Sequence, residues 1–217
     1  MRKKIILITA IIIVCICAIL FLENFEGDYV KGSKTVNQKS TKIYLKGDIG
    51  QLESNDINQV IDFLCTSKKI GQNINAKEEF ILKNKEVDSI GFTHYKLQQV
   101  VKGVPVYNGE LIVHVKKNNT IYLINGNYHK QAKEVYLNFE ELLEKSELEK
   151  KAVEAIDTCE MKKGEIGEKL IYNHNGEYTL VYEVKVYCLL SADKIYRVFI
   201  DGYTGEVYDY YNIVMTK

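Results

Sequence analysis

The sequence predicts an α+β protein in which helices lie on antiparallel strands, arranged as two small lobes behind an apolar N-terminal segment. Three observations predict this class. Residues 57–64 carry apolar side chains at the spacing of one helix face. Several runs between residues 90 and 213 alternate apolar and polar side chains, as half-buried strands do. The 217 residues include 16 tyrosines and one proline, a composition that favours sheet.

Residues 1–22 are predicted to be a transmembrane anchor. Arg2, Lys3 and Lys4 precede an apolar run over residues 5–22 that only Thr9 interrupts. A run of this length can cross a hydrocarbon core, and its basic flank places the N-terminus in the cytoplasm. No small-residue cleavage pattern follows, so we expect a single-pass protein of the cell membrane with its C-terminal domain extracytoplasmic. Cleavage of the segment would instead give a secreted protein.

A polar linker, residues 23–42, is expected to lead into the first domain, residues 43–130. The helix of this first domain is predicted to begin at residue 57, and Ser54, Asn55 and Asp56 are its N-cap candidates. Strands are predicted at residues 95–99, 111–115 and 121–124. We expect turns at Lys102–Gly103 and at residues 118–119, and the pair Asn125–Gly126 is interpreted as the end of the last strand.

The second domain is predicted over residues 138–213. A helical region runs over residues 138–158, but its apolar positions fall in two phases, which indicates a break near Ser146. Ser146 and Glu149 match a capping box. Strands are expected at residues 178–186, 195–200 and 207–213. The acidic, glycine-containing loop 201–206 lacks the ligand spacing of a calcium loop and is interpreted as a hairpin turn.

Composition and spacing exclude several kinds of function. The 29 basic and 29 acidic side chains balance, so neither nucleic acid nor an anionic surface is an expected partner. The histidines, at positions 94, 114, 129 and 174, never stand one helical turn apart as zinc-peptidase ligands do. His94 and His114 can meet across a hairpin, but two ligands fall short of a catalytic zinc site, and we interpret them as surface or structural histidines. No catalytic residue, cofactor, metal or small-molecule substrate is therefore expected.

The cysteines outside the apolar run are Cys65, Cys159 and Cys188. An odd number in an oxidising compartment leaves at least one unpaired, and the sequence does not define a pairing. We interpret each of them as an isolated buried thiol.

Two stretches resemble a known family. Residues 90–107, Ile-Gly-Phe-Thr-His-Tyr-Lys-Leu-Gln-Gln-Val-Val-Lys-Gly-Val-Pro-Val-Tyr, followed by the apolar strand 111–115 with its His114, resemble the propeptide motif of fungalysin/thermolysin-type metallopeptidases. Residues 146–213 are similar to a PepSY domain, with the helix around Ala152 and Ala155 and the hairpin 197–207. The resemblance implies two cystatin-like lobes. Only four residues follow Ile213, where the relatives continue into the peptidase, so we expect a propeptide-like protein that stands alone.

This resemblance implies a regulator of a secreted zinc metallopeptidase, acting in trans as an inhibitor or folding chaperone. The partner-binding residues that it implies are His94, Gln98, Gly103 and His114 on the hairpin. Ile213, Val214 and Met215 form a C-terminal tail that could enter a partner's cleft. The alternative is a cell-surface PepSY scaffold or sensor that holds a wall-active enzyme without inhibiting a peptidase. The propeptide motif favours the first function.

Overall fold

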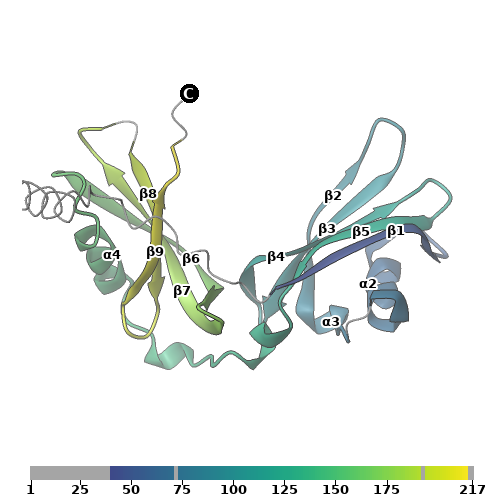
Figure 1. Ribbon diagram of the computed structural model, residues 1–217, viewed down its shortest axis with the longest axis horizontal. Coiled ribbons are helices and arrows are strands. Elements are labelled where there is room, and N and C mark those ends of the chain that lie inside the picture. The colour runs from purple at the N-terminus through teal and green to yellow at the C-terminus, as the bar shows by residue number, and fades with distance from the viewer. Residues whose placement is uncertain (1–39, 71–72, 192–193, 215–217) are drawn as a thin grey trace, which may run out of the picture. The chain divides into compact units, whose positions relative to one another are not determined.

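The computed structural model describes residues 40–70, 73–191 and 194–214. Within these ranges the chain is α+β, as the sequence predicts, and the strands form a curled sheet with few helices (Figure 1). No helix among the described residues is long and apolar enough to cross a membrane. The predicted anchor, residues 1–22, lies outside the described residues. So does the predicted linker up to residue 39, and its last two residues already belong to the first strand.

The described part of the first lobe contains two helices and five strands. The helices α2 and α3 lie on one face of its sheet (Figure 1), and a 3-10 turn, η1, joins them; their bounds are α2 Ile57–Thr66, η1 Lys68–Ile70 and α3 Ala76–Glu79. The strands are all antiparallel and stand in the order β2-β3-β4-β5-β1. Their bounds are β1 Thr41–Gln51, β2 Phe80–Val87, β3 Thr93–Val101, β4 Val104–Val115 and β5 Thr120–Tyr128.

Helix α2 begins as the sequence predicts. Asp56 is its N-cap, and the carboxylate accepts hydrogen bonds from the backbone N–H groups of Asn58 and Gln59. Val60 and Leu64 are fully buried against the inward-facing side chains of the sheet. The helix therefore forms because a side-chain cap and an apolar stripe coincide, and the stripe covers the sheet.

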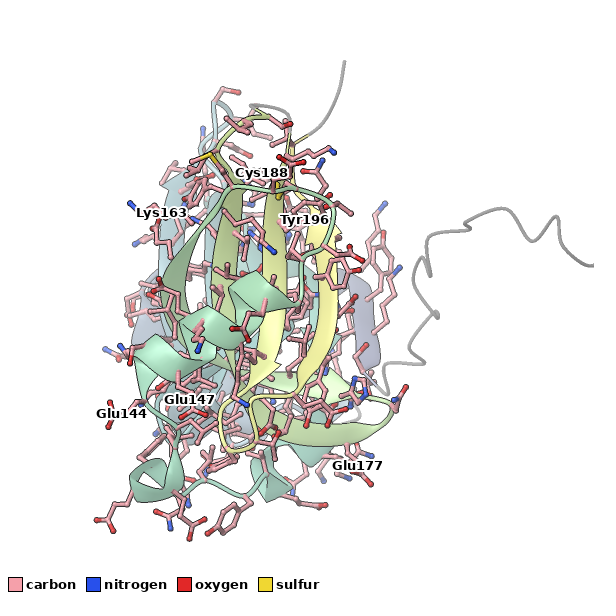
Figure 2. All side chains as sticks on the ribbon, turned by 90° about the vertical axis from the view of Figure 1, so that its left-hand side faces the viewer. Glu144, Glu147, Lys163, Glu177, Cys188 and Tyr196 are labelled. Carbon is pink, nitrogen blue, oxygen red and sulfur yellow. A yellow bond between two sulfur atoms is a disulfide. The ribbon has the colours of Figure 1, made fainter. Side chains whose placement is uncertain are left out.

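Among its described residues, the second lobe contains one helix and four antiparallel strands in chain order. The helix α4 packs across the sheet, where Leu148 and Ala152 meet the inward-facing side chains of β7 and β8 (Figure 2). Two 3-10 turns precede it, η2 and η3. The bounds are η2 Lys130–Glu134, η3 Phe139–Glu141, α4 Lys145–Glu154, β6 Lys162–His174, β7 Glu177–Cys188, β8 Ile195–Asp201 and β9 Val207–Asn212.

The lobes are not two separate sheets. Val106 of β4 pairs with Ile171 of β6 in a single parallel bridge, so the described strands belong to one hydrogen-bonded sheet. A small apolar cluster surrounds this bridge and includes Val104 and Ala132. His129, which follows β5, contacts Tyr178 of β7 through its Nδ1 atom at 3.0 Å.

Three details differ from the sequence expectations, and a fourth expectation is confirmed. Strands β1, β2 and β6 were not predicted, because their short apolar runs are interrupted by glycines or charged residues. Strand β5 continues through Asn125–Gly126, since β1 and β4 both pair with this segment and satisfy its backbone. Helix α4 starts at Lys145 with Glu144 as N-cap, so Ser146 lies inside the helix and caps nothing. The break before the helix is real, because residues 142–144 are not helical.

The cysteine prediction is wrong for two of the three residues. Cys159 and Cys188 form a disulfide that joins the segment after α4 to the end of β7. Only Cys65, on α2, is a free thiol among the described residues. Sequence spacing could not reveal the pair, because the two cysteines lie 29 residues apart. They come together only in the folded chain, where the end of β7 lies next to the segment after α4.

Candidate partner-binding surface

The β3–β4 hairpin carries most of the residues that the sequence singles out. Its turn is Lys102–Gly103, as predicted, and both residues have positive φ (48° and 80°), the geometry that matches the twist of a two-residue hairpin. The side chains of Tyr95, Leu97 and Leu111 point to the core and are fully buried. Alternation then leaves His94, Lys96 and Gln98 on the opposite face, which no described helix covers.

His94 and His114 stand directly opposite each other in the β3–β4 register. Their Nδ1 atoms are 2.6 Å apart. The Nε2 atom of His94 lies 3.0 Å from a carboxylate oxygen of Asp88, and the Nε2 atom of His114 lies 2.8 Å from the side-chain oxygen of Asn125. The expected meeting across the hairpin is therefore confirmed, as part of a four-residue chain that runs over three strands and a turn.

The surroundings of the pair shift the pKa values of His114 and Asp88. Burial lowers the pKa of His114 below its usual 6.5; the hydrogen bond with Asn125 opposes this shift, and the neighbouring His94 adds to it. The pKa of Asp88 is lowered, chiefly because its carboxylate accepts the backbone N–H of Phe92; the hydrogen bonds from His94 and Ile90 add to this, although desolvation opposes it. Asp88 thus closes the β2–β3 turn and faces the histidines as an anion.

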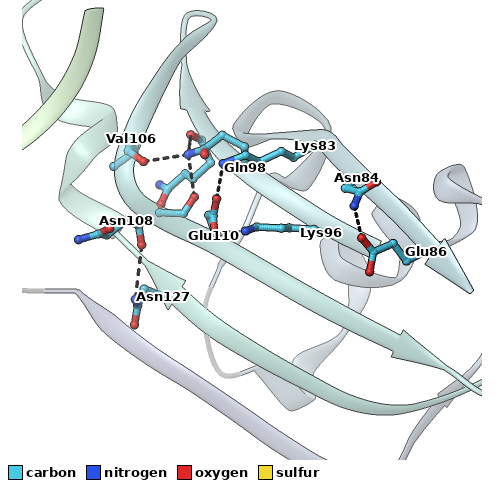
Figure 3. A network of polar contacts seen from close by, with 11 residues as sticks. Lys83, Asn84, Glu86, Lys96, Gln98, Val106, Asn108, Glu110 and Asn127 are labelled. Carbon is cyan, nitrogen blue, oxygen red and sulfur yellow. Dashed lines mark hydrogen bonds and ion pairs between the residues drawn. The ribbon is translucent and has the colours of Figure 1, made fainter. Parts of the chain in front are cut away.

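Glu110 lies on the same face of β4 as His114, four residues before it. Lys83 of β2 and Lys96 of β3 contact its carboxylate at 2.6 and 2.9 Å, as Figure 3 shows. Burial raises the pKa of Glu110, but the two lysines outweigh that effect and lower it. This face is therefore polar and already internally paired, so a partner would meet fixed hydrogen-bonding groups rather than free charges.

Gln98 has a structural role on this face. Its Nε2 atom donates to the backbone oxygens of Gln99, Val106 and Gly109 at 2.8–3.0 Å (Figure 3). The register between β3 and β4 shifts at this point, and the amide fills the hydrogen bonds that the shift leaves open. Gly103 lies at the turn end of the hairpin and does not join the histidines.

The C-terminal residues lie at one end of the second lobe. The backbone N–H of Ile213 donates to Ile195, so the sheet pairing extends one residue beyond β9. Val214 follows, with its N–H bonded to the side chain of Asn212. Met215 lies outside the described residues. Of the predicted partner-binding residues, the structure thus brings His94 and His114 into contact and leaves Gln98 further along the same face of β3. Ile213 and Val214 lie in the second lobe.

An exposed apolar group stands at the same end of the second lobe. We call it the exit patch, and its members are Met161, Leu189 and Leu190. The backbone of Leu189 bonds to Met161, next to the disulfide. Cys188 pairs through its backbone with Lys194, which precedes Ile195, so the patch and the tail share one end of the sheet. Figure 2 shows Cys188 at this end and Glu177 at the other. Sequence reasoning missed the patch, because two leucines at the end of a strand are typical of interior residues.

The hairpin between β8 and β9 is organised by Asp201, which is buried. One carboxylate oxygen accepts from the backbone of Tyr203 and Thr204, and the other accepts from the hydroxyls of Thr179 and Tyr208. Burial raises the pKa of Asp201, but these hydrogen bonds outweigh it and lower the pKa. The predicted hairpin turn at residues 201–206 is confirmed, and the carboxylate of Asp201 stabilises it.

The described residues contain no group of three or more histidine, cysteine, aspartate or glutamate side chains placed to hold a metal ion. Asp88, Asn125 and Glu110 are the neighbours that sequence reasoning missed. The signal for Asp88 was its place before Ser-Ile-Gly, a typical turn sequence. Asn125 was interpreted as a turn residue, and Glu110 stood out only as one polar residue among many.

Comparison with known proteins identifies the two modules of this fold. Residues 78–128 match the Fungalysin/Thermolysin Propeptide Motif, and residues 142–211 match the Peptidase propeptide and YPEB domain. The chain therefore carries both modules of a thermolysin-type propeptide, and the resemblance seen in the sequence is confirmed.

Curated relatives agree with this assignment. Bacillolysin of Bacillus subtilis (strain 168) is 25% identical over 181 residues, which cover 72% of this chain and 35% of that protein. Neutral protease B of the same strain is 33% identical over 131 residues, covering 56% of this chain and 23% of that protein. The chain thus spans about a third or less of these relatives. Among solved structures, the Bacillus megaterium YpeB C-terminal domain matches with 13% identity and a TM-score of 0.35, over 80% of this chain and 72% of that one.

Proposed function

We propose that this protein is a non-catalytic regulator of a secreted thermolysin-like zinc metallopeptidase, held at the cell membrane by residues 5–22 and acting outside the cytoplasm. The observation that carries the proposal is the succession of both propeptide modules, at residues 78–128 and 142–211. Regulation takes one of two forms, inhibition of the mature peptidase or assistance of its folding in trans. Either form needs a protein surface rather than reacting side chains.

The face around His94 and His114 is the first proposed docking surface. No described helix covers this face. Its polar groups already form hydrogen bonds and ion pairs with one another before a partner binds. Groups fixed in advance lose little freedom on binding, which favours a specific complex.

The tail and the exit patch form the second proposed surface. Val214 follows the last sheet pairing at Ile213, at the end of the lobe where Leu189 and Leu190 are exposed. An extended tail that enters a peptidase cleft uses main-chain hydrogen bonds and side-chain pockets. The exposed leucines next to it would be covered by the partner, which explains why large apolar side chains stand at the surface.

The proposal is tested with the full-length chain in a mild non-ionic detergent, added to a purified bacillolysin. We expect a stoichiometric complex and a slower peptidase, or a higher yield when the denatured peptidase is refolded beside it. An inhibition constant and a refolding yield separate the two forms. If the chain neither binds, inhibits nor assists refolding of such a peptidase, the proposal is wrong and the scaffold function replaces it.

The tail is tested by truncation. Removing residues 213–217 deletes Ile213, Val214 and Met215, whereas removing only residues 216–217 is the matched control. Each buried apolar side chain contributes about 1–3 kcal/mol, so we expect the longer truncation to weaken inhibition by at least about tenfold. Equal inhibition constants for both truncations and the intact chain would show that the tail is idle.

A further inference from the structure

The His94–His114 contact sets a limit on the number of protons that the pair can hold. Asp88 is an anion and can only accept, so Nε2 of His94 donates to it. The side-chain oxygen of Asn125 also only accepts, so Nε2 of His114 donates to it. Both Nε2 atoms therefore carry hydrogen.

The two Nδ1 atoms then face each other at 2.6 Å. If both rings were neutral, two lone pairs would point at one another at this distance and repel. One added proton converts the contact into an N–H···N hydrogen bond, in which one ring donates and the other accepts. The pair then has one positive charge, and the carboxylate of Asp88 balances it at 3.0 Å.

A second added proton has no place in this arrangement. Both Nδ1 atoms would then carry hydrogen and both rings a positive charge, with no acceptor between them. The rings stand edge to face with centroids 4.7 Å apart, so relief requires that one side chain leave the pair.

We propose that His94 and His114 share a single proton near neutral pH, and that this proton stabilises the β3–β4 hairpin on the face that no described helix covers. Acidification adds a second proton, and this removes the stabilisation. The inference goes beyond the proposed function, because it concerns the stability of the first lobe whether or not a peptidase binds. It also predicts that any partner docked on this face is released more readily in acid.

The charged groups around the pair leave Asp88 as its direct counter-ion. Glu86 of β2 stands opposite His94 in the register, but its carboxylate accepts from Asn84. On the far side, Tyr122 of β5 lies with its ring centroid 5.9 Å from that of His114. The cations on the surrounding elements that face the same region or its turns are Lys46, Lys96, Lys116 and Lys117.

The direction of the pH effect follows from these groups. Because the pKa of His114 is below its usual 6.5 in the folded chain, the unfolded chain binds the proton first. Below about pH 6.5 the unfolded chain holds a proton on each of these two histidines whereas the folded pair holds one, so the stability from this site is lost as the pH falls toward the lowered folded pKa of His114. Above about pH 6.5 the unfolded histidines lose their protons while the folded pair keeps the shared one, so the contribution is largest near pH 6.5 and also declines as the pH rises. The pKa of Asp88 is also lowered, but its contribution is lost only below about pH 3.8. His129 has a lowered pKa through burial and contributes in the same window as His114, so variants must separate the two sites.

The test measures unfolding of the full-length chain by denaturant at pH 6.5 and pH 5.0, in detergent. We expect the unfolding constant of the native chain to rise about tenfold more across this interval than that of the double variant His94→Gln/His114→Gln, since one extra proton taken up on unfolding gives about tenfold per pH unit. His174→Asn is the matched control, because His174 lies in the second lobe and contacts Asn175 and Tyr208 instead. Equal pH dependence in the native chain and the double variant would overturn the proposal.

Nitrogen NMR of the histidine side chains gives a readout that a structural role alone would not. With ¹⁵N-labelled histidine, a shared proton predicts a coupling between the two Nδ1 atoms at pH 7.5 that disappears in acid. Asp88→Asn serves as the second variant, since the amide keeps the oxygen that closes the turn but removes the balancing charge. In this variant we expect the shared-proton signal to appear only at lower pH. A native spectrum with two neutral, uncoupled rings at pH 7.5 would contradict the inference even if the double variant did not fold.

Discussion

The two lobes pair a similar helix-on-sheet core with different means of securing it. The first lobe is secured by side-chain hydrogen bonds, which come from the His94–His114 pair, from the Gln98 amide, and from Asn55, which joins Thr93 and Tyr95. The second lobe has the disulfide Cys159–Cys188 and the buried carboxylate of Asp201. The difference teaches that the first lobe responds to mild acid, whereas the second responds to reduction and only to strong acid.

The largest expected effect concerns the disulfide. Replacing Cys159 and Cys188 with serine should lower the free energy of unfolding by about 3–4 kcal/mol, because the cross-link closes a loop of 29 residues. Denaturant unfolding of the full-length chain under oxidising conditions measures the loss. Cys65→Ser is the control and should be close to the native chain, since Cys65 is free. If reduction and the double variant leave stability unchanged, the disulfide does not distinguish the lobes.

The next effect concerns the carboxylate of the β8–β9 hairpin. Asp201→Asn should cost about 2–3 kcal/mol, because an amide group replaces an acceptor that three hydroxyls and two backbone groups share. Asp209→Asn is the matched control, since Asp209 makes one long contact with Tyr172 at 3.4 Å.

The same variant has a defined pH dependence. A lowered pKa in the folded chain means that Asp201 stabilises above its usual 3.8 and loses this contribution as the pH falls through the folded value. The difference in unfolding free energy between the native chain and Asp201→Asn should therefore be constant from pH 7 to about pH 5 and shrink below pH 3.8. A difference that already shrinks at pH 6 would assign the acid response to the second lobe.

The smallest effect concerns the first lobe. Asn55→Ala removes the partner of two buried groups, the hydroxyls of Thr93 and Tyr95, and should cost about 1–2 kcal/mol. The exposed Asn58, one turn further on, is the control, and Asn58→Ala should change stability by less than about 0.5 kcal/mol. Thermal unfolding of both variants measures the loss of stability. Equal melting temperatures would show that Asn55 does not stabilise the contact between the start of α2 and the sheet.

Local patterns in the sequence determine much of this protein. The helix at Ile57, the turn Lys102–Gly103 and the strands β3, β4, β7 and β8 follow from cap residues, turn chemistry and alternation, which act over a few residues. The alternation also placed His94 and His114 on the polar face, because a strand has a period of two. The family resemblance rests on the same local motifs.

Long-range contacts decided the rest. Strand β6 contains Gly164 and Gly167 and shows no clear alternation, yet it pairs with β7 along most of its length, because β7 offers a full set of backbone partners. Helix α4 begins without a side-chain cap, since Leu148 and Ala152 are fixed by packing on the sheet. The joining of Cys159 to Cys188, and the placement of Asp88 and Asn125 at the two ends of the histidine pair, depend on pairing between distant strands. Sequence spacing carries no record of that pairing, so only the tertiary structure decided it.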